Sequence, residues 1–282
     1  MAAAARRLSF LGPRGTNTEM AALRHDGAAI LVPGESITAV TNLVLTGEAD
    51  EAIVPIENSL QGSVTETVDL LVHSLPLRIR RELILAIEAA LIGKPGTSMD
   101  AIEVVYSHPQ ALAQSRQYLQ ETLPYARQVA TLSTAQAVEQ VMEEEAAAAV
   151  APPRAAELNE AEILQRGVQD DPRNSTRFVV LAGEDASPSG DDKTSIVFNV
   201  DDRPGALVRV MQAFAEAGIN LTKIESRPAR EELGVYVFLL DCQGHRLDPA
   251  VRDVLAAVEQ QCRWLKILGS YPRDPGPSLS EV

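Results

Sequence analysis

The chain has 282 residues, 45% of them hydrophobic, and a formal net charge of -14 at pH 7. This length is sufficient for roughly two domains of about 100–200 residues each, with substantial cores. The acidic balance argues against nucleic acids and anionic membranes as partners, because both require a basic protein surface. No apolar run approaches the roughly 18 residues of a membrane span, and the N-terminal residues show no signal-peptide pattern, so we expect a cytoplasmic protein.

Cysteine and histidine usage gives no sign of a metal or redox centre. The two cysteines, Cys242 and Cys262, lie late in the chain in strand-like and helix-like contexts, which suits reduced thiols better than a disulfide framework. The four histidines are scattered without the spacing of metal ligands. A glycine-containing turn, Gly12–Thr18, lacks the G-x-G-x-x-G spacing of a dinucleotide fingerprint. We therefore expect neither a metal nor a cofactor.

The first half of the chain, residues 7–150, alternates between short β-like runs and helical patterns, which predicts an α/β fold with largely parallel strands. The long run Arg78–Ile92 is typical of a strand that crosses between two lobes, with a ligand cleft between them. Helices are predicted to start at Ser36, at a capping box in Ser63–Glu66, and at Thr134. The predicted strands are Leu8–Leu11, Ile30–Val32, Glu51–Val54, Arg78–Ile87, Val104–Tyr106, Gln128–Thr131 and Ala147–Ala151.

Three polar turns follow predicted strands, where α/β folds place their ligand sites. The first is Gly12–Thr18, which combines glycines with hydroxyls that can cap a helix. The second is Pro55–Ser63, and the third is Ser107–Leu112, in which Pro109 suits a first helical position. Each also has an ordinary interpretation as a strand-to-helix turn, because Asn, Ser and Gly are common turn residues.

A fourth stretch, Asp171–Phe178, places a hydroxyl, a cation and an aromatic ring side by side at Thr176, Arg177 and Phe178. In a regular strand, alternation sends Thr176 and Phe178 to one face and Arg177 to the other, whereas a backbone still turning at a strand start can bring all three together. A hydroxyl in a cleft can donate a hydrogen bond while a guanidinium grips a carboxylate. The alternative is a polar strand start with a surface arginine.

The last third of the chain predicts a second domain. Residues 183–192 are small and acidic, which is typical of a linker. The βαββαβ order that follows predicts a ferredoxin-like antiparallel sheet with two helices on one face. The exposed edge of such a sheet is commonly paired with a second copy, so we expect a homodimer or homotetramer. Residues 273–282 are expected to form a flexible tail. The six elements are predicted at Thr194–Val200, Gly205–Ala217, Leu221–Ser226, Val235–Asp241, Pro249–Gln261 and Trp264–Tyr271.

Taken in order, these motifs resemble those of the bacterial prephenate dehydratase family. The resemblance lies in Gly12-Pro13-x-Gly15-Thr16, Pro55-Ile56-Glu57-Asn58-Ser59-x-x-Gly62, Ser107-His108-Pro109-Gln110-Ala111-Leu112, Ser133-Thr134 and Asn174-x-Thr176-Arg177-Phe178. Two later motifs, Gly205-Ala206-Leu207 and Glu225-Ser226-Arg227-Pro228, resemble the phenylalanine-binding motifs of the ACT regulatory domain. The similarity covers about residues 7 to 271. It implies a two-lobed catalytic domain, similar to periplasmic binding proteins, over residues 1–182 and an ACT domain over residues 193–272. No helical pattern precedes the first strand, so we expect no fused chorismate mutase.

The resemblance implies that the chain converts prephenate to phenylpyruvate, with loss of carbon dioxide and water, in phenylalanine biosynthesis under feedback by L-phenylalanine. It gives Thr176 as the donor to the departing ring hydroxyl and Arg177 as the holder of a substrate carboxylate. Because an alcohol is a very weak acid, we expect Thr176 to act as an oriented hydrogen-bond donor. The implied catalytic residues are Thr176, Arg177, Phe178, Asn58 and Ser59; the implied substrate-binding residues are Thr16, Gln61, Gly62, Ser107, His108 and Thr134; the implied phenylalanine site comprises Gly205, Ala206, Leu207, Glu225, Ser226, Arg227 and Pro228.

Some positions depart from the family pattern, and other functions remain open. Asn17 stands where the family usually has an aromatic residue, Ser115 where cysteine is common, and Glu88 where histidine is frequent. Glu57 would repel a dianion, so we expect it to have a structural role. One alternative function is arogenate dehydratase, which acts on the transaminated substrate at the same site. An alternative of another class is a non-catalytic amino-acid sensor that only closes on its ligand.

Overall fold

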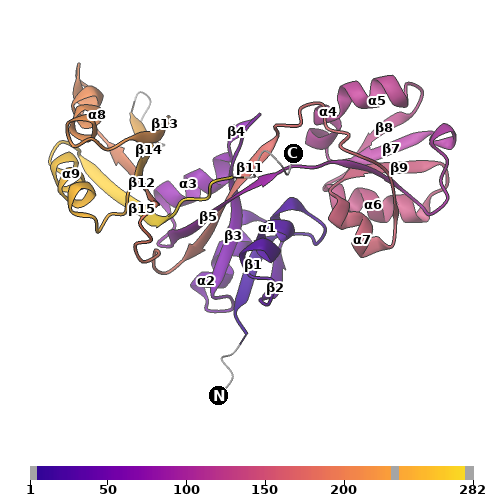
Figure 1. Cartoon of the computed structure of the whole chain (residues 1–282), viewed down its shortest axis with the longest axis horizontal. Helices are drawn as coiled ribbons and strands as arrows, with labels where there is room; N and C mark the ends of the chain where they lie inside the picture. Colours follow the sequence, from indigo (N-terminus) through magenta and orange to yellow (C-terminus); the bar gives the residue numbers. More distant parts are fainter. Residues whose placement is uncertain (1–4, 230–234, 277–282) are drawn as a thin grey trace. The chain divides into compact units, whose positions relative to one another are not determined.

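The computed structural model describes residues 5–229 and 235–276, which form two compact units (Figure 1). The first unit comprises the described residues up to 64, residues 83–178 and Gly276. The second comprises residues 65–82 and the described residues from 179 to 275. A short stretch from the first half of the chain therefore belongs with the C-terminal half.

One sheet of the first unit is built from strands β1 (Arg7–Leu11), β2 (Ile30–Gly34), β3 (Glu51–Asn58), β5 (Arg78–Ala86) and β11 (Ser175–Ala182). Their order is β2-β1-β3-β11-β5, and the short β4 (Gly62–Ser63) pairs with β3 as a hairpin. Helices α1 (Asn17–His25) and α2 (Ile37–Leu45) pack on this sheet. β5 comes from the second unit, which holds its residues 78–82, and β11 runs into the second unit, which holds its residues 179–182. The carboxyl end of β1 leads into the predicted turn Gly12–Thr18, and β3 ends within the predicted turn Pro55–Ser63.

The other sheet of the first unit has the order β10-β6-β9-β7-β8 and lies between two helical layers (Figure 1). Alternate residues of its central strand enter different cores: Ala149 packs with α6 and α7, whereas Val150 packs with α5. This alternation explains why every residue of β9 is buried. The elements are β6 (Ala90–Gly93), the 3-10 helix η1 (Met99–Ala101), β7 (Val104–Ser107), α4 (Pro109–Gln114), α5 (Arg116–Thr122), β8 (Arg127–Ala130), α6 (Thr134–Glu143), β9 (Ala147–Ala151), α7 (Pro153–Asn159) and β10 (Glu162–Arg166).

The second unit contains an antiparallel sheet in the order β13-β14-β12-β15, with two helices that share one core with it. Phe198 and Leu240 of the sheet pack against Val210 and Val258 of the helices. The βαββαβ order and this layered packing confirm the predicted ferredoxin-like unit. Its elements are β12 (Asp192–Asn199), α8 (Ala206–Glu216), β13 (Leu221–Pro228), β14 (Tyr236–Gln243), α9 (Pro249–Glu259) and β15 (Trp264–Pro272).

Helix α3 (Thr65–His73), which directly follows β4, belongs to this second unit. Lys266 of β15 donates from Nζ to the carbonyl oxygens of Leu71 and Leu75 at 2.6 and 3.0 Å, at the C-terminal end of the helix. A cation there is favourable because the last carbonyls of a helix are negative and unpaired. A second connection is the ion pair between Arg227 of β13 and Asp69 of α3, at 3.2 Å.

Near its start, at Ile79, strand β5 passes very close to Gly269 of β15. A Cβ atom on Gly269 would lie 2.2 Å from the carbonyl oxygen of Ile79, and Gly269 has a φ of +152°. The pairing of β15 with β12 shifts register at this glycine. Glycine is therefore required here both by the conformation and by the absence of space.

The predicted fold class is confirmed, with local corrections. Helix α3 starts at Thr65 rather than at a capping box on Ser63, because Ser63 pairs in β4. Helix α6 is capped by Ser133, one residue before the predicted Thr134. The strands are less uniformly parallel than expected, since β6 runs antiparallel to both β9 and β10. Most of the predicted tail, 277–282, lies outside the described residues.

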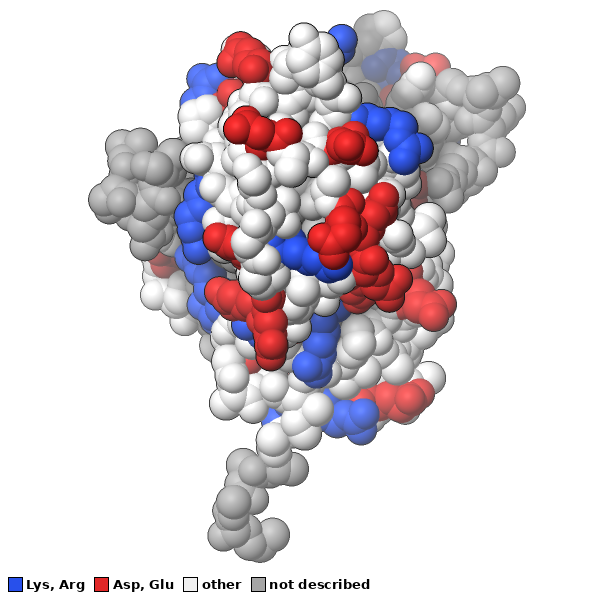
Figure 2. All heavy atoms as spheres, turned by 90° about the vertical axis from the view of Figure 1, so that its right-hand side faces the viewer, with Lys and Arg blue, Asp and Glu red and all other residues white. Residues whose placement is uncertain are grey.

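The surface agrees with the acidic composition. On the face shown in Figure 2, lysine and arginine side chains are interspersed with acidic ones rather than gathered into one basic field. Within the described residues, no helix is long and apolar enough to cross a membrane. The same residues contain no group of three or more His, Cys, Asp or Glu side chains arranged to hold a metal ion.

Candidate active site

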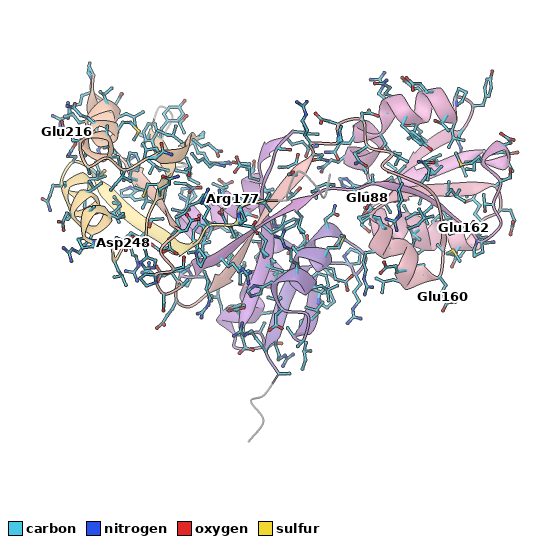
Figure 3. The ribbon with its side chains drawn as sticks, viewed as in Figure 1. Glu88, Glu160, Glu162, Arg177, Glu216 and Asp248 are labelled. Carbon is cyan, nitrogen blue, oxygen red and sulfur yellow. The ribbon has the colours of Figure 1, made fainter. Side chains whose placement is uncertain are left out.

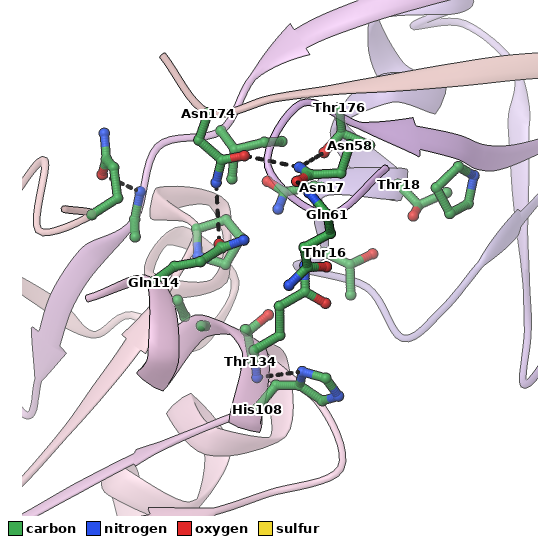
Figure 4. A pocket seen from close by; sticks show the side chains of 18 of the residues that line it. Thr16, Asn17, Thr18, Asn58, Gln61, His108, Gln114, Thr134, Asn174 and Thr176 are labelled. Carbon is green, nitrogen blue, oxygen red and sulfur yellow. Dashed lines mark hydrogen bonds between the residues drawn. The ribbon is translucent and has the colours of Figure 1, made fainter. Parts of the chain in front are cut away.

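The first unit contains a cavity of about 510 Å³ whose walls come from both of its sheets (Figure 4). All three predicted polar turns and the start of β11 contribute, as does the loop before α6. The lining includes Leu11, Thr16, Asn17, Thr18, Pro55, Asn58, Gln61, Gly62, Ser63, Val64, Ile87, Glu88, Ala89, His108, Gln110, Ala111, Gln114, Ser115, Leu132, Ser133, Thr134, Val150, Ala151, Pro152, Gln169, Asn174, Thr176 and Phe178.

A chain of amide side chains fixes the hydroxyl of Thr176 in this cavity. Asn58 donates from Nδ2 to Thr176 Oγ1 at 2.9 Å and to Asn174 Oδ1 at 2.8 Å. Asn174 in turn donates from Nδ2 to Gln114 Oε1 at 3.1 Å (Figure 4). Because an amide nitrogen can only donate, Thr176 accepts from Asn58, and its own hydroxyl hydrogen is left to point elsewhere. Thr176 is therefore arranged as a donor toward the cavity.

The amide oxygen of Asn58 holds the turn that follows β3. It accepts from the backbone N–H groups of Leu60 and Gln61 at 3.0 and 3.2 Å. This pattern is a side-chain-supported turn, for which asparagine is well suited. Asn58 is 7% exposed, so these bonds also satisfy an otherwise buried polar group. One residue thus shapes the turn and orients Thr176.

Two helix N-termini face the cavity. Thr16 caps α1 by accepting from the N–H of Glu19, and Ser133 caps α6 by accepting from the N–H of Gln136. Both capping residues line the cavity, as do the first residues of the two helices, Asn17 and Thr134. The N-terminal end of a helix carries a partial positive charge of about half an elementary charge. These ends favour an anionic ligand.

Few ionisable side chains line the cavity. Neither lysine nor arginine occurs among the described lining residues, and Glu88 is the acidic member. The Glu88 carboxylate lies 3.2 and 3.4 Å from the guanidinium of Arg166, and both side chains are well exposed (Figure 3). A ligand bound here therefore meets mainly the neutral amide and hydroxyl side chains of the described lining, in which His108 is the other ionisable residue.

Arg177 lies outside the cavity lining. Strand β11 begins at Ser175, so regular alternation applies, and it is Thr176 and Phe178 that line the cavity. The Arg177 guanidinium is 3.6 Å from the Glu57 carboxylate, and its side chain is 10% exposed (Figure 3). The role of Arg177 as a carboxylate clamp stays a prediction that no lining contact supports.

The structure brings most of the predicted catalytic and substrate-binding residues into one cavity, with exceptions. Besides Arg177, Ser59 and Ser107 lie outside the lining. Ser59 links the end of β3 to the start of β11, because its Oγ accepts from the N–H of Ser175 at 3.0 Å. Ser107 is fully buried and donates to the carbonyl of Val150 at 2.5 Å. The predicted residues that do line the cavity are Asn58, Thr176, Phe178, Thr16, Gln61, Gly62, His108 and Thr134.

Sequence reasoning missed Gln114, although it completes the amide chain. His108 caps α4 by accepting at Nδ1 from the N–H of Gln110 at 3.3 Å, and Gln114 follows at the end of that helix. Ala111 and Gln114, one turn apart on the helix, both line the cavity. A helical spacing of three residues places side chains on one face, which is the signal that could have found Gln114.

Comparison with known proteins gives the family. A family model described as prephenate dehydratase matches residues 8–186, and an ACT domain model matches residues 194–260. The chain belongs to the prephenate dehydratase family. This family consists of lyases.

Individual known proteins resemble the chain over nearly its whole length. The prephenate dehydratase of Mycobacterium sp. strain JLS is 41% identical, over 98% of this chain and 93% of that protein. The solved prephenate dehydratase of Arthrobacter aurescens in complex with L-Phe is 37% identical, covers 97% of this chain and 92% of its own, and has a TM-score of 0.88. A solved structure described as GqqA, a novel type of quorum quenching acylase, is 32% identical, covers 96% of this chain and 99% of its own, and has a TM-score of 0.87.

The ACT domain of this prephenate dehydratase family member separates the two predicted regulatory motifs. Gly205, with a φ of +80°, precedes α8, and Ala206 and Leu207 line a cavity of about 390 Å³ in the second unit. The motif Glu225–Pro228 lies on β13, an edge strand, and does not contribute to that cavity. Arg227 instead contacts Glu225 at 3.1 Å and Asp69 at 3.2 Å. Within the described residues, the cavity at the start of α8 is thus lined by the first motif and not by the second.

Proposed function

We infer that the chain converts prephenate to phenylpyruvate in the cavity of the first unit, the reaction for which its family is named. In this reaction the bond to the ring carboxylate breaks, and its electron pair completes the aromatic ring. The ring hydroxyl leaves and is protonated to water. Aromatisation supplies the driving force, so the protein has to orient a dianion and offer a donor to the leaving hydroxyl.

The observation that carries this proposal is the hydrogen bond from Asn58 Nδ2 to Thr176 Oγ1 at 2.9 Å. It uses a lone pair of the hydroxyl and leaves the hydroxyl hydrogen for the substrate. A hydroxyl held in this way donates best when the acceptor gains negative charge, as the departing oxygen does in the transition state. Preorganisation by Asn174 and Gln114 removes the need to reorient Thr176 during the reaction.

The dianion is held by the ends of α1 and α6. Residues at both helix starts, among them Thr16 and Thr134, line the cavity, whereas lysine and arginine are missing from its described lining. This distribution suits a decarboxylation. A salt bridge to the departing ring carboxylate would stabilise the ground state and resist the loss of carbon dioxide. Weaker hydrogen bonds orient the substrate without that penalty.

The test is phenylpyruvate formation from prephenate by the purified chain, alone and as Thr176→Ala. We expect turnover by the wild type and its loss in the variant. A well-folded wild type without turnover would contradict the proposal. The same substrate-depletion assay separates an enzyme from an amino-acid sensor, which binds its ligand and leaves it unchanged.

Arogenate is a second candidate substrate, because Glu88 lines the cavity and a carboxylate can attract the ammonium group that replaces the keto group. Its existing partner, Arg166, competes for that carboxylate. Parallel assays with prephenate and arogenate decide between the two. Since GqqA is described as an acylase, release of a carboxylic acid from an N-acyl amide is a useful counter-assay, and we expect none.

We propose L-phenylalanine as the effector of the ACT domain. The support is the solved relative in complex with L-Phe and the cavity at the start of α8. Because the Glu225–Pro228 motif lies on an edge strand away from this cavity, we propose that a second copy supplies that motif across a β13 edge. Calorimetry with phenylalanine and light scattering of the purified chain test both statements. A monomer that binds phenylalanine would contradict the shared site.

The proposed reaction belongs to phenylalanine biosynthesis, so we place the protein in the cytoplasm with its substrate. A fractionation experiment on cells that produce the chain tests this placement. Recovery outside the cytoplasmic fraction would contradict it.

A further inference from the structure

An ion pair connects the two lobes of the first unit beside the proposed active site. Arg154 lies on α7, which packs on the sheet containing β9, and Glu19 lies on α1, which packs on the sheet containing β1. Their nearest atoms, Arg154 Nε and Glu19 Oε2, are 3.6 Å apart. None of the predicted catalytic or binding roles includes either residue.

The environment of Glu19 requires a positive partner. Its side chain is only 2% exposed, and its Oε2 accepts from the N–H of Gly15 at 2.8 Å. A buried carboxylate is costly unless it is paired and hydrogen-bonded. Gly15 supplies one hydrogen bond, and Arg154 supplies the charge. Among the described residues Arg154 Nε is itself buried without a hydrogen-bond partner, so the pairing with Glu19 compensates both groups.

The backbone contact beneath this pair is tight. A Cβ atom on Gly15 would lie 3.2 Å from Ala155 Cα and 3.4 Å from the Ala135 side chain, and Gly15 has a φ of +85°. Ala155 lies on α7 and Ala135 on α6, so one glycine turn touches both helices of the opposite lobe. Any residue larger than glycine would separate these walls.

The pair and the glycine contact lie at the edge of the cavity. Thr16, next to Gly15, lines the cavity from one lobe. Pro152, just before α7, and Thr134, at the start of α6, line it from the other lobe. Since the ends of α1 and α6 carry like partial charges, they repel each other, and an attraction beside them offsets this repulsion. The attraction between Glu19 and Arg154 therefore acts across the two walls, next to the helix ends.

We propose that Glu19 and Arg154 are positioning residues that hold the two lobes at the spacing that binds the substrate dianion. The pair touches no substrate and acts through the Gly15–Thr16 turn. This inference rests on the proposed function. Its loss should weaken substrate binding more than turnover, because Thr176 and its amide partners remain in place.

The experiment compares Glu19→Gln, Arg154→Gln and the double variant in the prephenate assay, with Glu157→Gln as the matched control. Glu157 is the other carboxylate partner of Arg154, at 2.9 Å, and is 60% exposed. We expect KM to rise about threefold to tenfold in each single variant, with kcat changed less than about twofold. The double variant should be no worse than the worse single one, because both remove the same interaction. Glu157→Gln should match the wild type.

An unchanged KM, additive effects in the double variant, or an equal effect in Glu157→Gln would overturn the inference. A fall in kcat at constant KM would do so as well. If the wild type does not turn prephenate over, the proposed function fails, and the same cycle is read by calorimetric binding of phenylpyruvate. Additive changes in that affinity would overturn the positioning role independently of activity.

Discussion

Replacing Thr176 with valine tests the proposed donor with the smallest change in shape. The substitution removes the hydroxyl and keeps the branched side chain. Asn58 loses one acceptor but keeps Asn174 Oδ1 at 2.8 Å and the carbonyl of Ser175 at 3.2 Å. Its amide therefore stays satisfied, and we expect a stability loss of about 1 kcal/mol or less. The fold and the cavity should survive.

The expected loss of activity is far larger than the loss of stability. A positioned proton or hydrogen-bond donor contributes about 10²- to 10⁴-fold to rate. At 1.36 kcal/mol for each tenfold change, this amounts to roughly 3–5 kcal/mol of barrier. We expect kcat to fall by this factor while the affinity for substrate changes little, because the N-termini of α1 and α6 are untouched.

The assay is the initial rate of phenylpyruvate formation at saturating prephenate, together with a denaturant titration of both proteins. Thr134→Val is the matched control, since it removes another hydroxyl from the same cavity that does not bond to Asn58. Turnover by Thr176→Val within about threefold of the wild type would refute the donor assignment. An equal loss in Thr134→Val would show that polarity, rather than the oriented donor, matters.

Further predictions concern other parts of the chain. Gly269→Ala should lower the free energy of unfolding by more than about 3 kcal/mol, because the added Cβ would collide with β5. Gly183→Ala is the control, since a Cβ there meets no atom within 4 Å. Equal stabilities of the two variants would contradict the prediction. Arg177→Lys should change KM for prephenate by less than about threefold, because Arg177 faces Glu57; a larger rise would restore the carboxylate clamp. Asp69→Asn should preserve turnover but weaken the response to phenylalanine by about fivefold while calorimetry still detects phenylalanine binding; an unchanged response would exclude Asp69 from regulation. Burial raises the pKa of Cys242 to about 12, above its ordinary value of 9, so the neutral thiol's contribution to stability is present below pH 9 and is lost as pH rises through about 12. In a Cys262→Ser background a thiol reagent at pH 8 should therefore label Cys242 only after denaturation, and rapid native labelling would disprove this.

The residues near each strand end were predictable because local rules determine them. Alternation alone places Thr176 and Phe178 on one face, which is the arrangement found because β11 is regular from Ser175 onward; the turning strand start that would bring Arg177 beside them is not seen. Cap and turn chemistry located Thr16 and Asn58, because these side chains bond within a few residues of themselves. Such interactions need no knowledge of the tertiary fold.

The parts that could not be predicted depend on contacts between distant segments. The bond between Gln114 and Asn174 joins residues 60 positions apart, and no local pattern encodes it. The pair between Glu19 and Arg154 likewise depends on which helices meet across the cavity. The motif around Ser107 likewise gave no sign that its hydroxyl satisfies the buried carbonyl of Val150, and its assignment to substrate binding stays a prediction. Spacing along the chain does not specify these pairings.

The position of α3 limits how this protein can be divided. The family models assign this helix to the catalytic part, since the first match runs through residues 8–186, yet the helix packs with the ACT sheet through Lys266. A truncated chain ending at residue 186 would leave α3 without Lys266 and without the partner of Asp69. The ACT domain consequently cannot be removed without removing contacts of α3. Engineering that exchanges the ACT domain has to exchange α3 as well. Because α3 directly follows the β3–β4 hairpin that contains Asn58, such an exchange also alters the chain next to the proposed active site.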